Sequence, residues 1–371
     1  MFRTVSAALA AMSLGAAAHA IPPGVMNAYN AYMDAIEAND LRAAATHAEA
    51  AYQAGVNARI DAETLAALAE NRAQIYTDTG DAARAGPAWN DVAGALAAAG
   101  ADREDRARAL VSAGTFFYAQ DNAREGMRAA DAALALYPEP AASPWLFRAH
   151  NLKANLEWRN GRIAPAGMAA IAALAVQEQI GPRVDREIVQ TATLAAVGSS
   201  LTRNLEGTAF YVALASSVGG LAGVPEEEAR LLATWRAYAQ AGLSEEQAGS
   251  LAERQSESAL FRFDGPAFEP SGWADQAPGR VDAAVSRRFP PRVPPDLMRE
   301  GVAGFVILQF DVSPGGRANN IRPLMVVPHE GFARIAEQAL RRWEFTPATQ
   351  DGQPVLRQGM VMHFDLGAPR R

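Results

Sequence analysis

The side chains that most often carry out chemistry are few in this sequence and stand far apart. Four histidines follow residue 20, at His47, His150, His329 and His363, and cysteine is absent. The word HEGFA at His329 begins like a zinc-protease motif but lacks the second histidine, so we expect no metal site. The single lysine, Lys153, lies in no glycine-rich loop, which excludes phosphate-loop and Ser-Lys chemistry.

The clustered acids Glu226 to Glu228 follow Pro225 at the expected start of a helix. Proline fits the first helical turn and acids there oppose the helix dipole, so this cluster has a structural explanation. No G-x-S-x-G word occurs. From this supply of residues we expect no enzyme, no cofactor and no small-molecule substrate, and an exported enzyme ranks last among our hypotheses.

Net charge is −7, which disfavours a general nucleic-acid binder because phosphate neutralisation needs a basic surface. The charge is uneven along the chain. From Arg280 onward there are 13 Arg against 9 Asp plus Glu, a balance of +4. The last quarter is therefore a mildly basic module on an acidic body.

Residues 1–20 read MFRTVSAALAAMSLGAAAHA, with Arg3 before an apolar run and an A-x-A word at the end. This pattern predicts a secretory signal cleaved before Ile21. The run of about 14 apolar residues is too short to span a bilayer comfortably. The alternative is an inner-membrane anchor through an uncleaved N-terminus. A second uncharged stretch, 207–224, is rich in glycine and serine, and we interpret it as a buried helix.

Sequence motifs typical of turns recur about every 40 residues in the first half, at EANDLR, DTGDAAR, AQDNAR and RNGRIA. The apolar residues between them follow helical spacing, and Asp40, Asp81 and Asn122 are good N-cap residues. The pattern predicts about four stacked helical hairpins that loosely resemble tetratricopeptide repeats. The repeat fades after Gly181, although helix remains credible to about Gln255. A packed bundle with no binding role is an open alternative.

Glycine and proline interrupt the chain after residue 255, so we expect a linker over 256–284. Beyond it, GFVILQFDV alternates strictly between two faces from Gly304, SPGGR supplies a turn, and ANNIRPLMVV reads as a returning strand. A helical stripe runs over GFARIAEQALRRW, and a last strand is predicted at 359–366. The order is strand, strand, helix, strand.

After that helix, LRRWEFTPATQDGQPV closes the module. Trp343 and Phe345 are expected as large anchors beneath the helix, with Phe310 in the same core, while Pro347 ends the helical path. The Asp351-Gly352 turn then redirects the chain.

Over about 289–366 the sequence resembles the C-terminal domain of TonB-family proteins, the periplasmic energy transducers of Gram-negative outer-membrane transport. The resemblance rests on Phe289-Pro290, Gly301 followed by Gly304, Gly316-Arg317, and the words WEFTPA at Trp343 and DGQPV at Asp351. Phe289 stands where the family usually has Tyr.

The resemblance implies that the last strand is an exposed edge that takes up an extended peptide of an outer-membrane receptor or another envelope protein. Here that edge would consist of Met360, Val361, Met362, His363, Phe364, Asp365 and Leu366. Alternatively this strand pairs within the chain or with a second copy. The family's energised members also carry a membrane helix and a proline-rich spacer, which this sequence replaces with a signal and a helical body.

The fold class we expect is a mainly α helical-repeat body with a small α+β C-terminal domain. The domains would be a signal peptide at 1–20, helical hairpins at 21–255, a linker at 256–284 and the TonB-like domain at 285–371. The leading hypothesis is a periplasmic, non-enzymatic peptide-binding protein of outer-membrane transport. The alternative is a periplasmic scaffold whose repeats and terminal domain mediate assembly or dimerisation.

Overall fold

The computed structural model describes residues 21–263, 277–295, 304–328 and 330–366. The predicted signal sequence 1–20 and His329 lie outside this part of the chain. The chain divides into two compact units with the boundary after Leu156, and each unit is described separately below.

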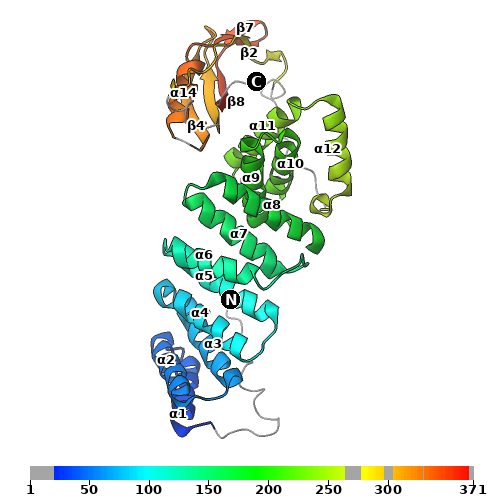
Figure 1. The fold of residues 1–371 in the computed structure, drawn as a ribbon. Coiled ribbons are helices and arrows are strands. Elements are labelled where there is room, and N and C mark those ends of the chain that lie inside the picture. The colour runs from blue at the N-terminus through cyan, green and yellow to red at the C-terminus, as the bar shows by residue number, and fades with distance from the viewer. Residues whose placement is uncertain (1–20, 264–276, 296–303, 329, 367–371) are drawn as a thin grey trace. The chain divides into compact units, whose positions relative to one another are not determined.

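The first unit is a stack of helical hairpins (Figure 1). Its helices are α1 (Pro23–Glu37), α2 (Leu41–Ala58), α3 (Ala62–Asp78), α4 (Ala82–Ala98), α5 (Arg103–Ala119), α6 (Ala123–Leu134) and α7 (Pro144–Arg159), of which α7 crosses the boundary. The core combines alanines, which let helices approach closely, with large anchors such as Tyr32, Tyr76 and Trp89.

The predicted turns between the helices of each hairpin are present. Asn39, Gly80 and Asp121 take positive φ angles, and the next residue in each case accepts a hydrogen bond at the start of the following helix. Asp40, Asp81 and Asn122 thus cap α2, α4 and α6, as their residue types predict. The first four backbone amides of a helix have no partner within the helix and need such caps. The turn and cap residues therefore determine where each helix begins, and with it the length of the repeat.

The second unit begins with further helices, α8 (Ile163–Ile180), α9 (Arg186–Leu201), α10 (Leu205–Leu221), α11 (Glu226–Ala241) and α12 (Glu245–Glu257), followed by a short 3-10 turn at Ala259–Phe261. The hairpins therefore do not fade after Gly181, because two more helix pairs follow. Their caps are regular: Asn204 accepts from the Gly207 amide, and Ser244 forms a full capping box with Gln247.

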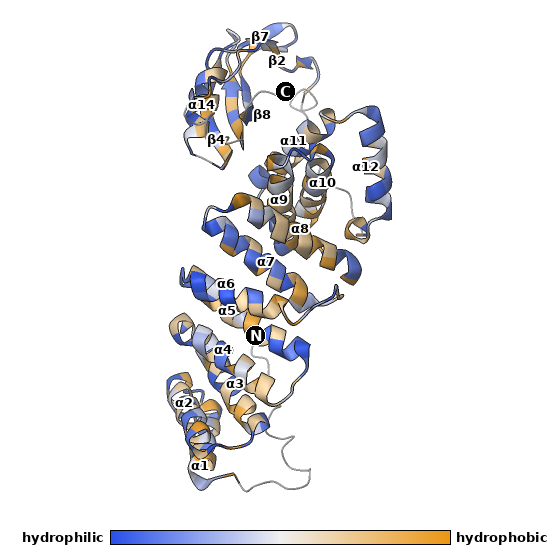
Figure 2. Ribbon diagram, in the orientation of Figure 1, coloured by the Kyte–Doolittle hydropathy of each residue, from blue (hydrophilic) through white to orange (hydrophobic). Residues whose placement is uncertain are grey.

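Helix α10 is buried at every position from Gly207 to Gly219, which confirms the interpretation of this uncharged stretch as a core helix. Among the described residues, one helix, α8, is long and apolar enough to cross a membrane by length and composition, and 44% of it is buried inside the protein. Figure 2 shows long apolar stretches on α8, in contrast to the hydrophilic α12.

The strand-rich part of the second unit holds three small antiparallel sheets. Their strands are β1 (Arg280–Val281), β2 (Ala284–Arg287), β3 (Gly304–Val312), β4 (Ala318–Val327), β5 (Glu344–Thr346), β6 (Ala348–Gln350), β7 (Gln353–Val355) and β8 (Arg357–Leu366), with helix α14 (Gly331–Leu340) between β4 and β5. The sheet orders are β4-β3-β8, β2-β5 and β1-β6-β7. The expected order of strand, strand, helix, strand is present as β3, β4, α14 and β8.

The three-stranded sheet carries the core of this part. One face of β3, from Val306 to Val312, packs with Phe332, Ile335, Ala336, Ala339 and Leu340 of α14, as the helical stripe predicts. The fold class is thus confirmed: a helical-repeat body and a small α+β C-terminal part. The segment 280–284, expected to end a linker, already belongs to the sheets, since β1 pairs with β6 and β2 with β5.

Candidate functional site

The predicted peptide-binding strand, β8, lies at one edge of its sheet. Strand β3 is central, and β8 pairs with it from Gly304 opposite Leu366 to Val312 opposite Arg357. In the described part of the chain no strand pairs with the outer side of β8. Its outward amides and carbonyls are therefore the kind of edge to which another chain can add. Strand β4 forms the opposite edge.

The side chains of β8 alternate between two faces of the sheet. Met360, Met362, Phe364 and Leu366 point toward α14 and belong to the apolar core. Val361, His363 and Asp365 lie on the other face, opposite Gln309, Ile307 and Phe305 of β3. Every second residue of an added strand would therefore meet one of two different chemical environments.

Two carboxylates fix the start of β8. Asp311 of β3 accepts a hydrogen bond from the Gly359 amide at 2.8 Å. Asp282 accepts one from Nε of Arg357 at 2.7 Å, and this guanidinium is largely buried. Both contacts lie at the N-terminal end of β8, so these two carboxylates hold the strand where it begins.

The second face of the sheet is covered by helix α11, which sequence reasoning did not predict. Trp235 of α11 packs on Phe305 with ring centroids 5.3 Å apart, and both side chains are almost fully buried. The Tyr238 ring stacks on His363 at 4.0 Å, and its hydroxyl donates to Oδ2 of Asp365 at 2.7 Å. At the N-terminal end of α11, Glu227 pairs with Arg322 of β4 at 2.8 Å.

His363 occupies a slot between two aromatic rings, since Phe305 stacks on its other side at 5.0 Å. Neither ring nitrogen has a hydrogen-bond partner in the described structure. Burial lowers the pKa of His363 to about 4, against a smaller opposing effect of the Asp365 carboxylate, whose oxygen lies 3.7 Å from Nδ1. His363 is therefore uncharged at neutral pH, and its imidazole packs between the Tyr238 and Phe305 rings.

The large residues expected beneath the helix lie in the core. Phe310, Trp343 and Phe345 are at most 6% exposed, and Pro347 is half-buried between β5 and β6. The indole Nε1 of Trp343 donates to the carbonyl of Phe289 at 2.7 Å, which ties the segment after β2 to the core. The Asp351-Gly352 turn has positive φ at both residues, the pattern of a tight hairpin between β6 and β7.

The turn between β3 and β4 also depends on glycine. Gly316 has φ +73°, and a side chain there would come within 2.2 Å of the Phe345 carbonyl. The Phe345 amide in turn donates to the Gly316 carbonyl at 3.0 Å. This close backbone approach explains the glycine at position 316, because only glycine combines that φ angle with that proximity.

Within the described ranges, the remaining chemistry-bearing side chains do not come together. His150 is partly buried, which lowers its pKa, with a smaller contribution from Lys153, and the Lys153 ammonium pairs with Asp131. Among the described residues no group of three or more His, Asp or Glu could hold a metal ion. Glu226 to Glu228 lie in the first turn of α11, as their structural explanation requires.

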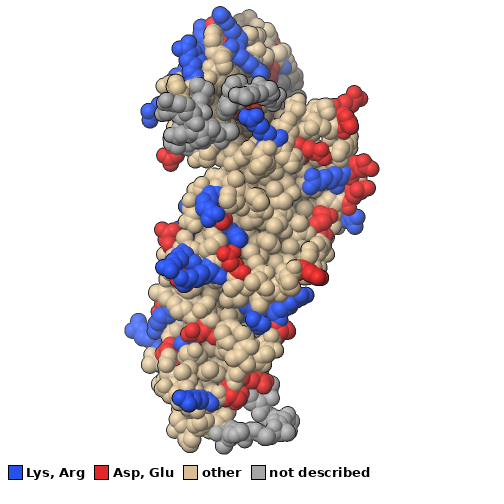
Figure 3. All heavy atoms as spheres, viewed as in Figure 1, with Lys and Arg blue, Asp and Glu red and all other residues tan. Residues whose placement is uncertain are grey.

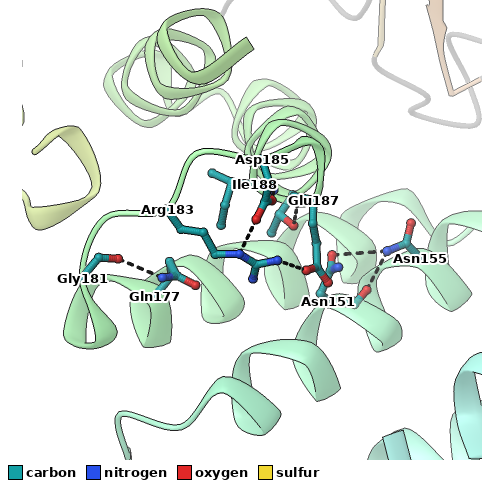
Figure 4. Close-up of polar contacts among 9 residues, drawn as sticks. Asn151, Asn155, Gln177, Gly181, Arg183, Asp185, Glu187 and Ile188 are labelled. Atoms are coloured by element: carbon teal, nitrogen blue, oxygen red, sulfur yellow. Dashed lines mark hydrogen bonds and ion pairs between the residues drawn. The ribbon is translucent and has the colours of Figure 1, made fainter. Parts of the chain in front are cut away.

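A polar cluster between α8 and α9 also has a structural role (Figure 4). The Arg183 guanidinium binds the carboxylates of Asp185 and Glu187, and Asp185 caps the Ile188 amide at 3.0 Å. Gln177 donates to the Gly181 carbonyl at 2.8 Å. These contacts close the turn into α9.

Comparison with known proteins identifies relatives of the C-terminal part of the chain. Residues 290–366 match the family model described as the Gram-negative bacterial TonB protein C-terminal. Protein TonB of Pseudomonas aeruginosa is 34% identical over 100 residues, covering 27% of this chain and 28% of that protein. Protein TonB of Xanthomonas campestris is 36% identical over 73 residues, covering 20% of this chain and 33% of that protein. The chain thus spans about a third or less of the length of these relatives.

Solved structures resemble the two parts separately. The solution structure of the Pseudomonas aeruginosa TonB C-terminal domain covers 24% of this chain and 90% of that domain, with 31% identity and a TM-score of 0.22. A signal-transduction ATPase with a tetratricopeptide repeat sensor from Pyrococcus horikoshii covers 63% of this chain and 37% of that protein, with 12% identity and a TM-score of 0.45. Residues 290–366 therefore resemble the C-terminal domain of TonB proteins.

Proposed function

We propose that this protein binds an extended segment of an outer-membrane receptor, or of another envelope protein, by strand addition to β8, as part of TonB-dependent transport. The observation that carries this proposal is that no strand of the described residues pairs with the outer side of β8, in a module that matches TonB proteins. Backbone hydrogen bonds along Met360–Leu366 would supply affinity, and the two side-chain environments of the strand would supply selectivity. The protein acts by binding and carries no catalytic site in this proposal.

The location follows from the same proposal. An exported protein with the signal at 1–20 would meet receptor segments in the periplasm. Basic side chains gather on the C-terminal part in Figure 3 and would speed the encounter with acidic segments. The intact mass of the exported protein tests this proposal, because a chain that begins at Ile21 supports periplasmic release and an uncleaved chain supports an inner-membrane anchor.

The binding experiment compares prolines at two neighbouring positions of β8. Successive residues of a strand direct their amides to opposite sides, so of Val361 and Met362 one donates to β3 and the other faces outward. Proline at the outward position should weaken binding of acidic receptor N-terminal peptides at least tenfold and leave the free energy of unfolding nearly unchanged. Proline at the inward position should instead lower stability, because it removes a ladder hydrogen bond.

A second candidate function is a scaffold in which this edge pairs with another copy of the chain. Strands β8 and β4 form the two edges of the three-stranded sheet among the described strands, which favours that possibility. Sedimentation of the full-length protein over a concentration series distinguishes the two. No saturable peptide binding together with a concentration-dependent dimer would support the scaffold and reject receptor binding.

A further inference from the structure

Strand β8 is held at its two ends by different parts of the protein. Its start is fixed by hydrogen bonds to the carboxylates of Asp311 and Asp282. Its end is fixed by helix α11, where the Tyr238 hydroxyl donates to Oδ2 of Asp365 at 2.7 Å. Helix α11 lies before the segment 290–366 that matches TonB proteins, so the second contact comes from outside that match.

Helix α11 also holds the neighbouring strand at the same position. Trp235 packs on Phe305 of β3 with ring centroids 5.3 Å apart, and Phe305 is the residue paired with Asp365 across the ladder. Two residues earlier on β8, His363 lies between the Tyr238 and Phe305 rings. Because Trp235 and Tyr238 are three residues apart, one turn of α11 contacts both strands where β8 ends.

The same helix is packed into the helical body. Ala229 and Leu232 of α11 are buried, and a Cβ placed at Gly219 of α10 would lie 3.5 Å from Cδ1 of Leu232. Close packing of this kind resists movement of one helix relative to the other. The end of β8 is therefore anchored, through α11, to a helix of the repeat body.

An edge strand needs such support before a peptide arrives. In the described part of the chain, β8 has a paired neighbour on one side only, which is β3. Fixing the backbone of each residue has an entropic cost, and a peptide that adds to a disordered edge must offset that cost. An edge that is already ordered in the free protein binds more tightly for this reason.

Building on the proposed strand addition, we propose that α11 positions the last four residues of β8, 363–366, for the incoming peptide. Trp235 and Tyr238 are then positioning residues of the peptide edge, and the helical body contributes to its affinity. Trp235 is 1% exposed, so it acts on the peptide only through the strands. Its removal should weaken binding roughly tenfold, the factor that corresponds to the backbone ordering of a single residue.

The test compares two buried tryptophans of the helical repeats. Trp235→Ala removes the contact with the sheet, and Trp89→Ala, at a 5% exposed position of α4 in the first unit, is the matched control. Acidic receptor N-terminal peptides are titrated into each full-length variant under conditions where urea titration shows it to be folded. Trp235→Ala should raise the dissociation constant roughly tenfold, whereas Trp89→Ala should keep it within about twofold of wild type.

Amide hydrogen exchange of the free proteins separates positioning from a general loss of stability. In Trp235→Ala, exchange should rise over 363–366 and stay near the wild-type rate over 357–360, where the two carboxylates hold the strand. Tyr238→Phe is a milder variant for both measurements, because it keeps a ring on His363 and loses the hydrogen bond to Asp365. It should weaken peptide binding about threefold.

A dissociation constant that is unchanged in Trp235→Ala and Tyr238→Phe overturns the positioning role while strand addition stands. Exchange that rises equally along the whole of β8, or an equal loss of affinity in Trp89→Ala, overturns it as well. Should Trp235→Ala fail to fold, the affinity and exchange of Tyr238→Phe decide alone. If no peptide binds the wild-type protein, strand addition and the positioning role both fail.

Discussion

The phenol ring of Tyr238 lies flat on the imidazole of His363, with ring centroids 4.0 Å apart and planes 21° from parallel. One residue belongs to a repeat helix and the other to the last strand of the TonB-like module. Because Phe305 covers the opposite side of the imidazole, the histidine is fixed between the helical body and the sheet. Any change in its charge acts on the contact between them.

The stability of this contact should depend on pH. The pKa of His363 is lowered from its ordinary value of 6.5 to about 4 by burial, so above pH 6.5 the folded and unfolded states are both neutral here. Below pH 6.5 the unfolded state takes up a proton that the folded state does not. The free energy of unfolding should therefore fall as pH drops from 6.5 toward 4, by at most about 1.4 kcal/mol per unit.

Urea titrations of the full-length protein at several pH values measure this effect. His150 also has a lowered pKa and contributes in the same direction. The informative quantity is thus the difference in the free energy of unfolding between wild type and His363→Phe at each pH, because phenylalanine keeps an aromatic ring but does not titrate. A pH profile that is the same in both proteins would show that His363 does not control the contact.

Trp235→Ala should disrupt the docking of α11 on the sheet. The indole is 1% exposed and packs on Phe305, and removal of a buried Trp costs about 3–5 kcal/mol. Trp158→Ala is the control, because that side chain is 36% exposed, and it should cost less than Trp235→Ala because it removes less buried apolar surface. Chemical denaturation compares them, and equal losses would contradict a tight α11–sheet contact.

Much of the fold could be predicted because local chemistry set it. The turn motifs and N-cap residues predicted the length of the hairpins. The helical spacing of apolar residues from Phe332 to Leu340 predicted α14 and its buried face. The helix pairs after Gly181 were not predicted, although the same turn is present there. Arg203 takes the left-handed conformation and Asn204 caps α10, as Asp121 and Asn122 do before α6, but the surrounding sequence differs from the earlier turn motifs.

The site was only half predictable. The resemblance to TonB-family proteins implied an exposed edge at the last strand, yet the cover provided by α11 depends on contacts more than 60 residues apart in sequence. Phe305 and Ile307 gave a signal that was not used: both lie on the second face of β3, and large apolar side chains there indicate a second packing partner. Which helix supplies it cannot be read from periodicity, because several helices have suitable faces.

The approach of α8 and α9 predicts a sharp contrast between two glycines. A Cβ at Gly167 would lie 2.4 Å from the Cα of Gly198, so backbone meets backbone. Gly167→Ala must move the helices apart and should cost roughly 1–3 kcal/mol. Gly94, in the exposed face of α4, has nothing within 4 Å of its Cβ position. Gly94→Ala should stabilise by up to about 1 kcal/mol, and thermal unfolding measures both.

Trp343→Phe should loosen the segment that precedes the three-stranded sheet. The substitution removes the indole donor of the 2.7 Å hydrogen bond to the Phe289 carbonyl but keeps a ring against Phe364 and Phe345. A lost bond of this kind costs about 1–3 kcal/mol when the acceptor is left without a partner. Amide hydrogen exchange should therefore rise in residues 284–293 more than in β3, because β3 keeps both of its neighbouring strands. Equal exchange changes in both segments would mean that Trp343 acts mainly through its volume, and that the Phe289 carbonyl finds another donor.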